Sequence, residues 1–287
     1  PFVNSLQPSE IGKFAMIFYL SYLFSEKISL AKLQDWKEGF LKFTMVAGGI
    51  IGLVVLQPDF GSALVMVCIA VTIYFLAGAN WRHFVVGGAI VLFLAMIALA
   101  TQPHIRKRVV SFLEPNNECL DDCWQTRQAN IAIGSGGFWG KGLTQGIQKS
   151  YWLPQAADDF VFAASAEELG FIRTSFIVLL YLMISYRGFQ IANHAPNKFA
   201  MLAAGGISAW ISAQAFLNIM VNTALFPITG VTLPFMSYGG SSMVTTLMAV
   251  GVLLNISQYT KTNAYRSNGG RNSRPRRTKS RYSRRYR

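Results

Sequence analysis

The sequence predicts an all-α, polytopic integral membrane protein. Hydrophobic residues make up 52% of its 287 residues and charged residues only 14%, whereas a soluble domain carries roughly 25% charged residues. Three stretches, 60–81, 84–103 and 199–260, contain no Asp, Glu, Lys or Arg. A helix that crosses the hydrocarbon needs about 20 mostly apolar residues, so these stretches are typical of membrane spans rather than of buried helices in a soluble protein.

Seven transmembrane helices are expected in this chain. The last uncharged stretch is interrupted by the helix-breaking residues Pro227, Gly230 and Pro234, so we interpret it as two spans joined by a turn. The expected helices are approximately 8–25, 43–58, 61–79, 84–102, 163–186, 199–225 and 238–259.

The distribution of charge predicts the orientation. Much of the net charge of +13 lies in residues 261–287, which contain Lys and Arg but no acid. Cytoplasmic loops carry an excess of Lys and Arg, so we expect this end inside and the long segment 103–158 outside. The expected organisation is a membrane domain at 1–260, a large extracytoplasmic loop at 103–158 within it, and a disordered basic cytoplasmic tail at 261–287.

The basic tail has two possible partners. Arg281-Tyr282 and Arg285-Tyr286 alternate cation and aromatic ring, as single-stranded nucleic-acid binders do. Anionic lipids of the cytoplasmic leaflet attract the same charge. We therefore expect contact with membrane lipids or protein partners and no nucleic acid.

The most informative polar stretch is 154–170. Pro154 predicts the start of a helix that enters the membrane, with Asp158 and Asp159 in its first turn, where the helix dipole favours anions. Acids this close to hydrocarbon are costly and indicate function. Capping of the helix by the two aspartates is the structural alternative.

Two further features belong to the same helix. Small residues share one face with Asp159 at helical spacing, which allows close approach of a neighbour or a substrate. They are Ala163, Ala166 and Gly170. Glu167 and Glu168 follow on other faces, either as functional acids or as buried, paired ones.

Other polar groups are expected near membrane depth. Glu10 and Lys13 are three apart and can pair, while Lys13 alternatively snorkels or contacts a phosphate. Asp59 is expected to cap the following helix. The segment 226–242 is kinked and rich in hydroxyls, and irregular backbone at this depth needs burial in protein or a cavity. Side chains that could satisfy it are Asn218 and Asn222.

Residues 103–158 contain three notable features. Arg106-Lys107-Arg108 precedes apolar residues, as in an interfacial stretch, or consists of snorkelling charges at a helix end. The glycine-rich run 133–142 lacks nucleotide-loop spacing, and a turn whose amides approach a polar ligand is the better interpretation. Cys119 and Cys123 either form a disulfide or remain free thiols. Cys68, in a predicted span, is expected to pack in the core.

Four motifs stand in order along the chain. They are Gln7-Pro8-Ser9-Glu10 with Lys13; Gln57-Pro58-Asp59-Phe60-Gly61-Ser62-Ala63; Asp159-Phe160 with Glu167-Glu168-Leu169-Gly170; and Pro227, Gly230 and Leu233-Pro234-Phe235 with Ser237-Tyr238-Gly239-Gly240-Ser241-Ser242. In this order they resemble the SEDS family (shape, elongation, division and sporulation), whose members include FtsW, RodA and SpoVE. The resemblance covers residues 1 to about 260. Phe60 and Thr229-Gly230 look more like FtsW than RodA.

The resemblance implies a ten-helix peptidoglycan glycosyltransferase of the bacterial cytoplasmic membrane. Such an enzyme polymerises lipid II, an undecaprenyl-pyrophosphate-linked disaccharide peptide, into glycan strands at the outer face, and the FtsW type acts at the division septum. The implied partners are a class B penicillin-binding protein and other divisome proteins. With seven helices expected here, about three more are expected before Pro1. A lipid II flippase and a non-catalytic divisome scaffold are the alternatives.

The resemblance also implies roles for individual residues. The family's catalytic aspartate corresponds to Asp159, although Ala157 and Asp158 stand where the family has His and Thr, and Tyr151 where some members have a glutamate. We expect Asp159 to act as the general base and cations to stabilise the pyrophosphate. The substrate-binding residues expected are Lys13, Glu10, Arg106, Arg108, Glu167, Ser237 and Ser241. A divalent cation, Mg²⁺ or Mn²⁺, could be held by Asp158 and Asp159.

Overall fold

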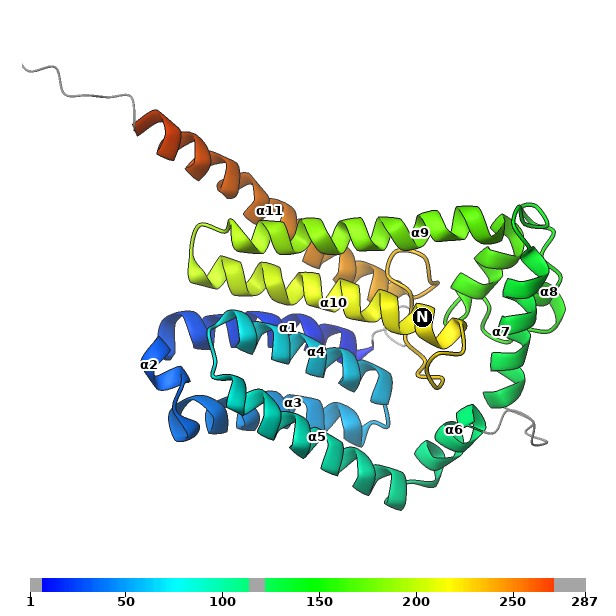
Figure 1. The fold of residues 1–287 in the computed structure, drawn as a ribbon, viewed down its shortest axis with the longest axis horizontal. Helices are drawn as coiled ribbons and strands as arrows, with labels where there is room; N and C mark the ends of the chain where they lie inside the picture. Colours follow the sequence, from blue (N-terminus) through cyan, green and yellow to red (C-terminus); the bar gives the residue numbers. More distant parts are fainter. Residues whose placement is uncertain (1–6, 114–121, 271–287) are drawn as a thin grey trace, which may run out of the picture.

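The computed structural model describes residues 7–113 and 122–270, with the backbone alone for His104, Asp122 and 261–270. The described residues form helices, turns and loops without a strand. Figure 1 shows a bundle of helices with three further helices gathered at one end, which we call the loop end. These three are α6 (Pro103–Leu113), α7 (Asp122–Gly136) and α8 (Gln148–Tyr151). The all-α prediction is confirmed.

In the part of the chain that the structure describes, five helices are long and apolar enough to cross a membrane. They are Trp36–Leu56, which includes α3 (Lys42–Leu56); α5 (Trp81–Thr101); α9 (Val161–Asn193); α10 (Lys198–Asn222); and Gly240–Thr260 of α11 (Gly240–Gly270). The helix α4 (Phe60–Leu76) is apolar but has only 17 residues, and α1 (Pro8–Tyr22) carries Glu10 and Lys13. All seven expected helices are present, while seven as the number of spans stays a prediction.

Some boundaries differ from those expected. The helix α9 runs past its expected end at 186 to Asn193, and it kinks at Gly170. The helix α11 continues to Gly270, ten residues into the segment expected to be tail, and 271–287 lie outside the described residues. Between α1 and α3, the connection folds as the short helix α2 (Leu30–Leu33) between π-helical turns at Leu23–Lys27 and Trp36–Leu41.

The core of the bundle forms around α10. Figure 1 shows α10 between α9 on one side and α1 and α4 on the other, and it packs against all three. Ala203 and Ala204 are fully buried, because their small side chains let the neighbouring helices approach closely. The facing helices contribute fully buried apolar residues: Met16, Ile17, Leu20, Met66, Ile69 and Ile73.

The helix α5 lies at the edge of the bundle, with His83 as its only buried residue. The Nδ1 atom of His83 lies 2.7 Å from the hydroxyl of Tyr74 on α4, and the ring of Trp36 packs edge-on against the imidazole. This contact attaches α5 to the bundle at the end opposite the loop end. The same helix leads directly into α6, which carries basic residues to the loop end.

Candidate active site

Residues 157–159 are held in place by hydrogen bonds to their main-chain carbonyls. Each of the three carbonyls accepts hydrogen bonds from the C-terminal part of the chain. The pairs are Ala157 O with Tyr238 N at 2.9 Å, Asp158 O with Ser237 Oγ at 2.5 Å, and Asp159 O with Asn218 Nδ2 at 2.8 Å and Asn222 Nδ2 at 2.9 Å. The backbone that carries the two aspartates is therefore fixed by segments about 60 to 80 residues away in sequence.

The two aspartates precede α9 instead of lying in its first turn. Gln155 has a φ of +53°, whereas residues of a right-handed α-helix have a negative φ. The helix α9 begins only at Val161. The expectation that Pro154 starts the helix is therefore wrong, and so is the alternative that the aspartates cap it. The Ala163 N–H at the helix start bonds instead to Oδ1 of Asn222, at 3.0 Å.

The carboxyl group of Asp159 is half-buried at the loop end. Burial is the main reason that its pKa is raised to about 6; the charges of Asp158 and Asp59 act in the same direction, and the charge of Arg108 acts against them. A general base works best when its pKa lies near the operating pH. The environment of Asp159 therefore suits it to accept a proton in neutral solution.

One cation of the strip 106–108 lies near enough to act electrostatically on this carboxylate. Arg108 Nη1 donates to the carbonyl of Ile228 at 3.2 Å, and its charge acts on Asp159. Arg106 is exposed, and because residues two apart on a helix do not share a face, it points elsewhere. Of the two arginines predicted to bind substrate, the structure brings only Arg108 to Asp159.

The serines of the fourth motif are buried. Ser237 Oγ donates to the carbonyl of Asp158 and accepts from Leu233 N at 2.7 Å. Ser241 is 8% exposed, and its carbonyl accepts from Thr245. Both serines were predicted to bind substrate, but in this structure Ser237 stabilises the irregular segment and Ser241 is buried at the start of α11. Asn218 also satisfies it, as predicted, by donating to Val231 O at 2.7 Å.

Glu10 and Lys13 form the predicted ion pair, at 2.7 Å, deep in the bundle. They are 3% and 1% exposed, so neither has an open face for a substrate. Lys13 also donates to Oε1 of Gln214 at 2.8 Å, and Gln214 Nε2 donates to the carbonyl of Thr232 at 3.1 Å. The ion pair is thereby linked to the irregular segment through α10, a link that residue spacing in the sequence does not predict.

Asp59 caps α4, as predicted. Its Oδ1 accepts from Ser62 N at 3.0 Å, and its Oδ2 accepts from Ser9 Oγ at 3.0 Å and from Gln7 Nε2 at 3.2 Å. The first two sequence motifs are thus joined at the loop end.

Glu167 is fully buried and anchors α8. Its carboxylate accepts from Lys141 Nζ at 2.7 Å, Ile147 N at 3.0 Å and Gln148 N at 3.0 Å. Glu168 forms an ion pair with Lys149. Both glutamates are therefore paired with lysines, as expected if they have a structural and not a functional role. Glu167 was predicted to bind substrate, but it is fully buried and exposes no oxygen to one.

The glycine-rich run packs against the kink of α9. Gly142 N donates to the carbonyl of Glu168 at 3.1 Å, and Phe171 N donates to the carbonyl of Gly137 at 2.8 Å. Gly170 has a φ of +78°, and a β-carbon on Gly140 would lie 2.1 Å from the carbonyl oxygen of Glu168. The prediction that these amides approach a polar ligand is wrong, because they approach α9, whose small residues permit it.

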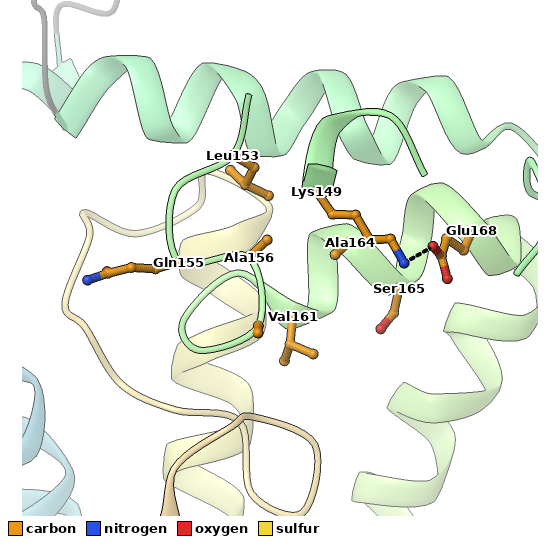
Figure 2. A pocket seen from close by; sticks show the side chains of 9 residues that line it. Lys149, Leu153, Gln155, Ala156, Val161, Ala164, Ser165 and Glu168 are labelled. Carbon is orange, nitrogen blue, oxygen red and sulfur yellow. Dashed lines mark ion pairs between the residues drawn. The ribbon is translucent and has the colours of Figure 1, made fainter. Parts of the chain in front are cut away.

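A cleft of 560 Å³ opens beside the candidate site, between residues 149–157 and α9. In Figure 2 the side chains of Lys149 and Glu168 point toward one another in its wall. Ala157 and Val161, which flank the aspartates, line the cleft, whereas Asp159 does not. The two charged residues that line the cleft, Lys149 and Glu168, are therefore paired with each other.

The described residues contain no group of three His, Cys, Asp or Glu side chains that could hold a metal ion. An ion at Asp158 and Asp159 would therefore find no third such side chain in the part of the chain that the structure describes. Cys68 is exposed on α4, so its expected place in the core is wrong. Cys119 lies outside the described residues, and so does the disulfide that it could form with Cys123.

These features define a class of protein: a multi-pass helical membrane protein with a half-buried aspartate and an arginine at one end of the bundle. A sequence profile of the FtsW, RodA and SpoVE family, described as "Cell cycle protein", matches residues 3–262. The chain belongs to this family, the SEDS family.

Two relatives illustrate the similarity. Stage V sporulation protein E of Bacillus subtilis is 41% identical over 257 residues, which cover 90% of this chain and 70% of the relative. The "Probable peptidoglycan glycosyltransferase FtsW" of Thioalkalivibrio sulfidiphilus is 40% identical over 260 residues, which cover 89% of this chain and 64% of the relative. The chain thus spans about two thirds of their length.

Solved structures share the fold. A chain from "Structural coordination of polymerization and crosslinking by a peptidoglycan synthase complex" matches with a TM-score of 0.72 and 26% identity, covering 89% of this chain and 70% of that one. The rod shape determining protein RodA of Thermus thermophilus matches with a TM-score of 0.59 and 28% identity, covering 88% of this chain and 66% of that one.

Proposed function

We propose that the chain is the larger part of a peptidoglycan glycosyltransferase that polymerises lipid II during cell division. Its similarity to FtsW and to a chain of a peptidoglycan synthase complex supports this function. The observation that supports this chemistry is the environment of Asp159. Its carboxylate is half-buried, hydrogen bonds fix its main-chain carbonyl, and the charge of Arg108 acts on it. A class B penicillin-binding protein is the proposed partner.

In the proposed reaction, a hydroxyl of the acceptor sugar attacks the anomeric carbon of a lipid-linked donor. The hydroxyl proton passes to the carboxylate of Asp159 as the new C–O bond forms. The bond from the anomeric carbon to the pyrophosphate oxygen breaks, and undecaprenyl pyrophosphate leaves with the electron pair. Base catalysis of this kind contributes roughly 10²–10⁴-fold to the rate.

The leaving pyrophosphate needs positive charge. Guanidinium groups bind phosphate oxygens in a bidentate manner, and Arg108 is the cation whose charge acts on the proposed base. We assign this role to Arg108 rather than to Lys13, whose ammonium is committed to Glu10 and Gln214. Mg²⁺ is commonly held by one or two carboxylates plus substrate phosphates, so Asp158 with the pyrophosphate would hold the ion while Asp159 acts as the base.

We place the loop end at the outer face of the membrane and the C-terminus in the cytoplasm. The basic residues of 261–287 support this orientation, because they belong to the last part of α11 or come after it in the sequence, and α11 starts at the loop end and leads away from it. Lipid II would then reach Asp159 from the outer leaflet, next to α6.

The test is polymerisation of purified lipid II by the full-length protein, with and without its penicillin-binding partner. Asp159→Asn should abolish polymer while leaving expression intact, and Glu38→Gln, in an exposed ion pair at the other end of the bundle, should behave as wild type. Translocation of lipid II without polymer would favour a flippase. Undiminished polymer from Asp159→Asn would remove this residue from the mechanism.

A further inference from the structure

The carboxamide of Asn222 is inserted between two main-chain groups at the start of α9. Its Nδ2 donates to the carbonyl of Asp159 at 2.9 Å, and its Oδ1 accepts from the N–H of Ala163 at 3.0 Å. In an α-helix, the N–H of one residue bonds directly to the carbonyl four residues earlier, which is the relationship of Ala163 to Asp159. The side chain therefore stands where a direct helical bond would form.

This bridging amide belongs to a ladder on one face of α10. Gln214, Asn218 and Asn222 recur every four residues, so they share that face, and each is at most 1% exposed. Asn218 Nδ2 donates both to Asp159 O at 2.8 Å and to Val231 O at 2.7 Å, and Asn222 Nδ2 also donates to Asn218 O at 2.9 Å. One rigid helix thereby holds the aspartate and the irregular segment together.

The ladder determines where the carboxylate can be. The carbonyl of Asp159 accepts hydrogen bonds from two buried side-chain amides. Rotating this peptide unit would leave those buried polar groups without partners, which costs free energy in the protein interior. A direct bond from Ala163 would instead extend α9 by a turn and rotate Asp159 into it. The inserted amide prevents this and keeps the side chain outside the helix.

We propose that Asn218 and Asn222 are positioning residues, which set the place of the Asp159 carboxylate by binding its main-chain carbonyl. The proposal rests on the proposed function, in which Asp159 is the base. Neither asparagine is required to touch the substrate.

The experiment measures steady-state polymerisation by the full-length protein carrying Asn222→Leu, which keeps the volume and removes both hydrogen bonds. Misplacing a reacting group by about 1 Å can cost roughly 10²-fold in rate, so kcat should fall about 10- to 100-fold. The KM for lipid II should stay within about twofold of wild type. The acid limb of the pH–rate profile should move to lower pH, because the carboxylate leaves its half-buried place.

Ser212→Ala is the matched control. Ser212 Oγ lies on the same helix and donates to Ser185 Oγ of α9 at 2.7 Å, remote from residues 157–163. It should keep the wild-type kcat within about twofold and the same acid limb.

Two results would overturn the proposal. One is a wild-type kcat and acid limb in Asn222→Leu. The other is a loss of kcat that matches the loss of folded protein, with the acid limb unchanged, since a purely structural role produces that pattern. The Asp159→Asn test separates this proposal from the proposed function, because polymer from wild type and none from Asp159→Asn upholds the function whatever Asn222→Leu does.

Discussion

The carboxylate of Asp159 lies against Gly230, where an added β-carbon would be 3.6 Å from Oδ2. Gly230 has a φ of +71°, a conformation that residues with a β-carbon rarely adopt. The turn that divides the last uncharged stretch of the sequence therefore forms one wall of the candidate site. The proposed base and this turn come from segments about 70 residues apart.

Gly230→Ala should destabilise the protein by about 1–2 kcal/mol without blocking the site. The distance of 3.6 Å is ordinary van der Waals contact, so the cost arises from the left-handed backbone. Thermal unfolding in detergent measures it. Gly88→Ala on the exposed helix α5, with no atom within 4 Å of the new methyl group, is the control and should be neutral or slightly stabilising. Equal effects of both substitutions would contradict the prediction.

The rate of polymerisation should rise with pH through about 6 and level off above 7. The pKa of Asp159 is about 6 because the group is half-buried, and only the ionised carboxylate can take the proton. A pH–rate profile at saturating lipid II tests this. An acid limb near 4, the ordinary range of an aspartate, would show that the carboxylate is solvated during the reaction.

Asp159→Asn should stabilise the folded protein at pH 7.5 but not at pH 4. Since folding raises the pKa of this carboxyl from 3.8 to about 6, the wild-type protein loses stability as pH rises between these values. The loss amounts to on the order of 2–3 kcal/mol above pH 6, and the neutral amide avoids it. Unfolding temperatures at the two pH values provide the measurement, and a gain of the same size at both would show that the pKa of Asp159 is not raised by folding.

Lys13→Met should be among the most damaging substitutions outside the candidate site. It leaves the carboxylate of Glu10 buried without its ammonium partner, and breaking a buried pair costs roughly 3–5 kcal/mol. The double variant Lys13→Met with Glu10→Gln should recover much of that loss. Lys42→Met is the control, because its pair with Glu38 is exposed and contributes at most about 1 kcal/mol. Yield and unfolding temperature report all three.

Glu167→Gln should loosen α8 and the residues before it. The carboxylate holds Lys141 and the N–H groups of Ile147 and Gln148, and an amide cannot satisfy all of these donors. Limited proteolysis should cut near 141–148 faster than in wild type. Glu168→Gln, whose pair with Lys149 is partly exposed, should change the cleavage rate less. Unchanged cleavage in Glu167→Gln would rule out an anchoring role.

The sequence predicted the apolar helices, the order of the motifs and several local pairs correctly. The Glu10–Lys13 pair and the cap by Asp59 follow from spacing within one or two turns of helix. Such features are local, because helical periodicity alone brings the side chains together. The small face predicted to include Asp159 is wrong in that respect, because Asp159 precedes α9 and the helix kinks at Gly170.

The prediction of a helix from Pro154 was wrong for a reason that lies elsewhere in the chain. Local propensity favours a helix start there, but the carbonyls of 157–159 bond to Ser237, Tyr238 and two asparagines of α10. The substrate roles expected for Glu167, Ser237 and Ser241 rested on residue type, whereas each side chain is buried in the structure. The spacing of Gln214, Asn218 and Asn222 was the one signal in the sequence that could have indicated the ladder.

The sequence by itself determined that this chain is a helical membrane protein of the SEDS family with an aspartate at residue 159, because hydropathy and ordered motifs are properties of the linear chain. The tertiary structure decided the surroundings of that aspartate: the buried amides of α10, the guanidinium of Arg108 and the turn at Gly230. The physical reason is that burial and hydrogen bonding, which fix the position and the pKa of a carboxylate, depend on residues far apart in sequence that only packing brings together.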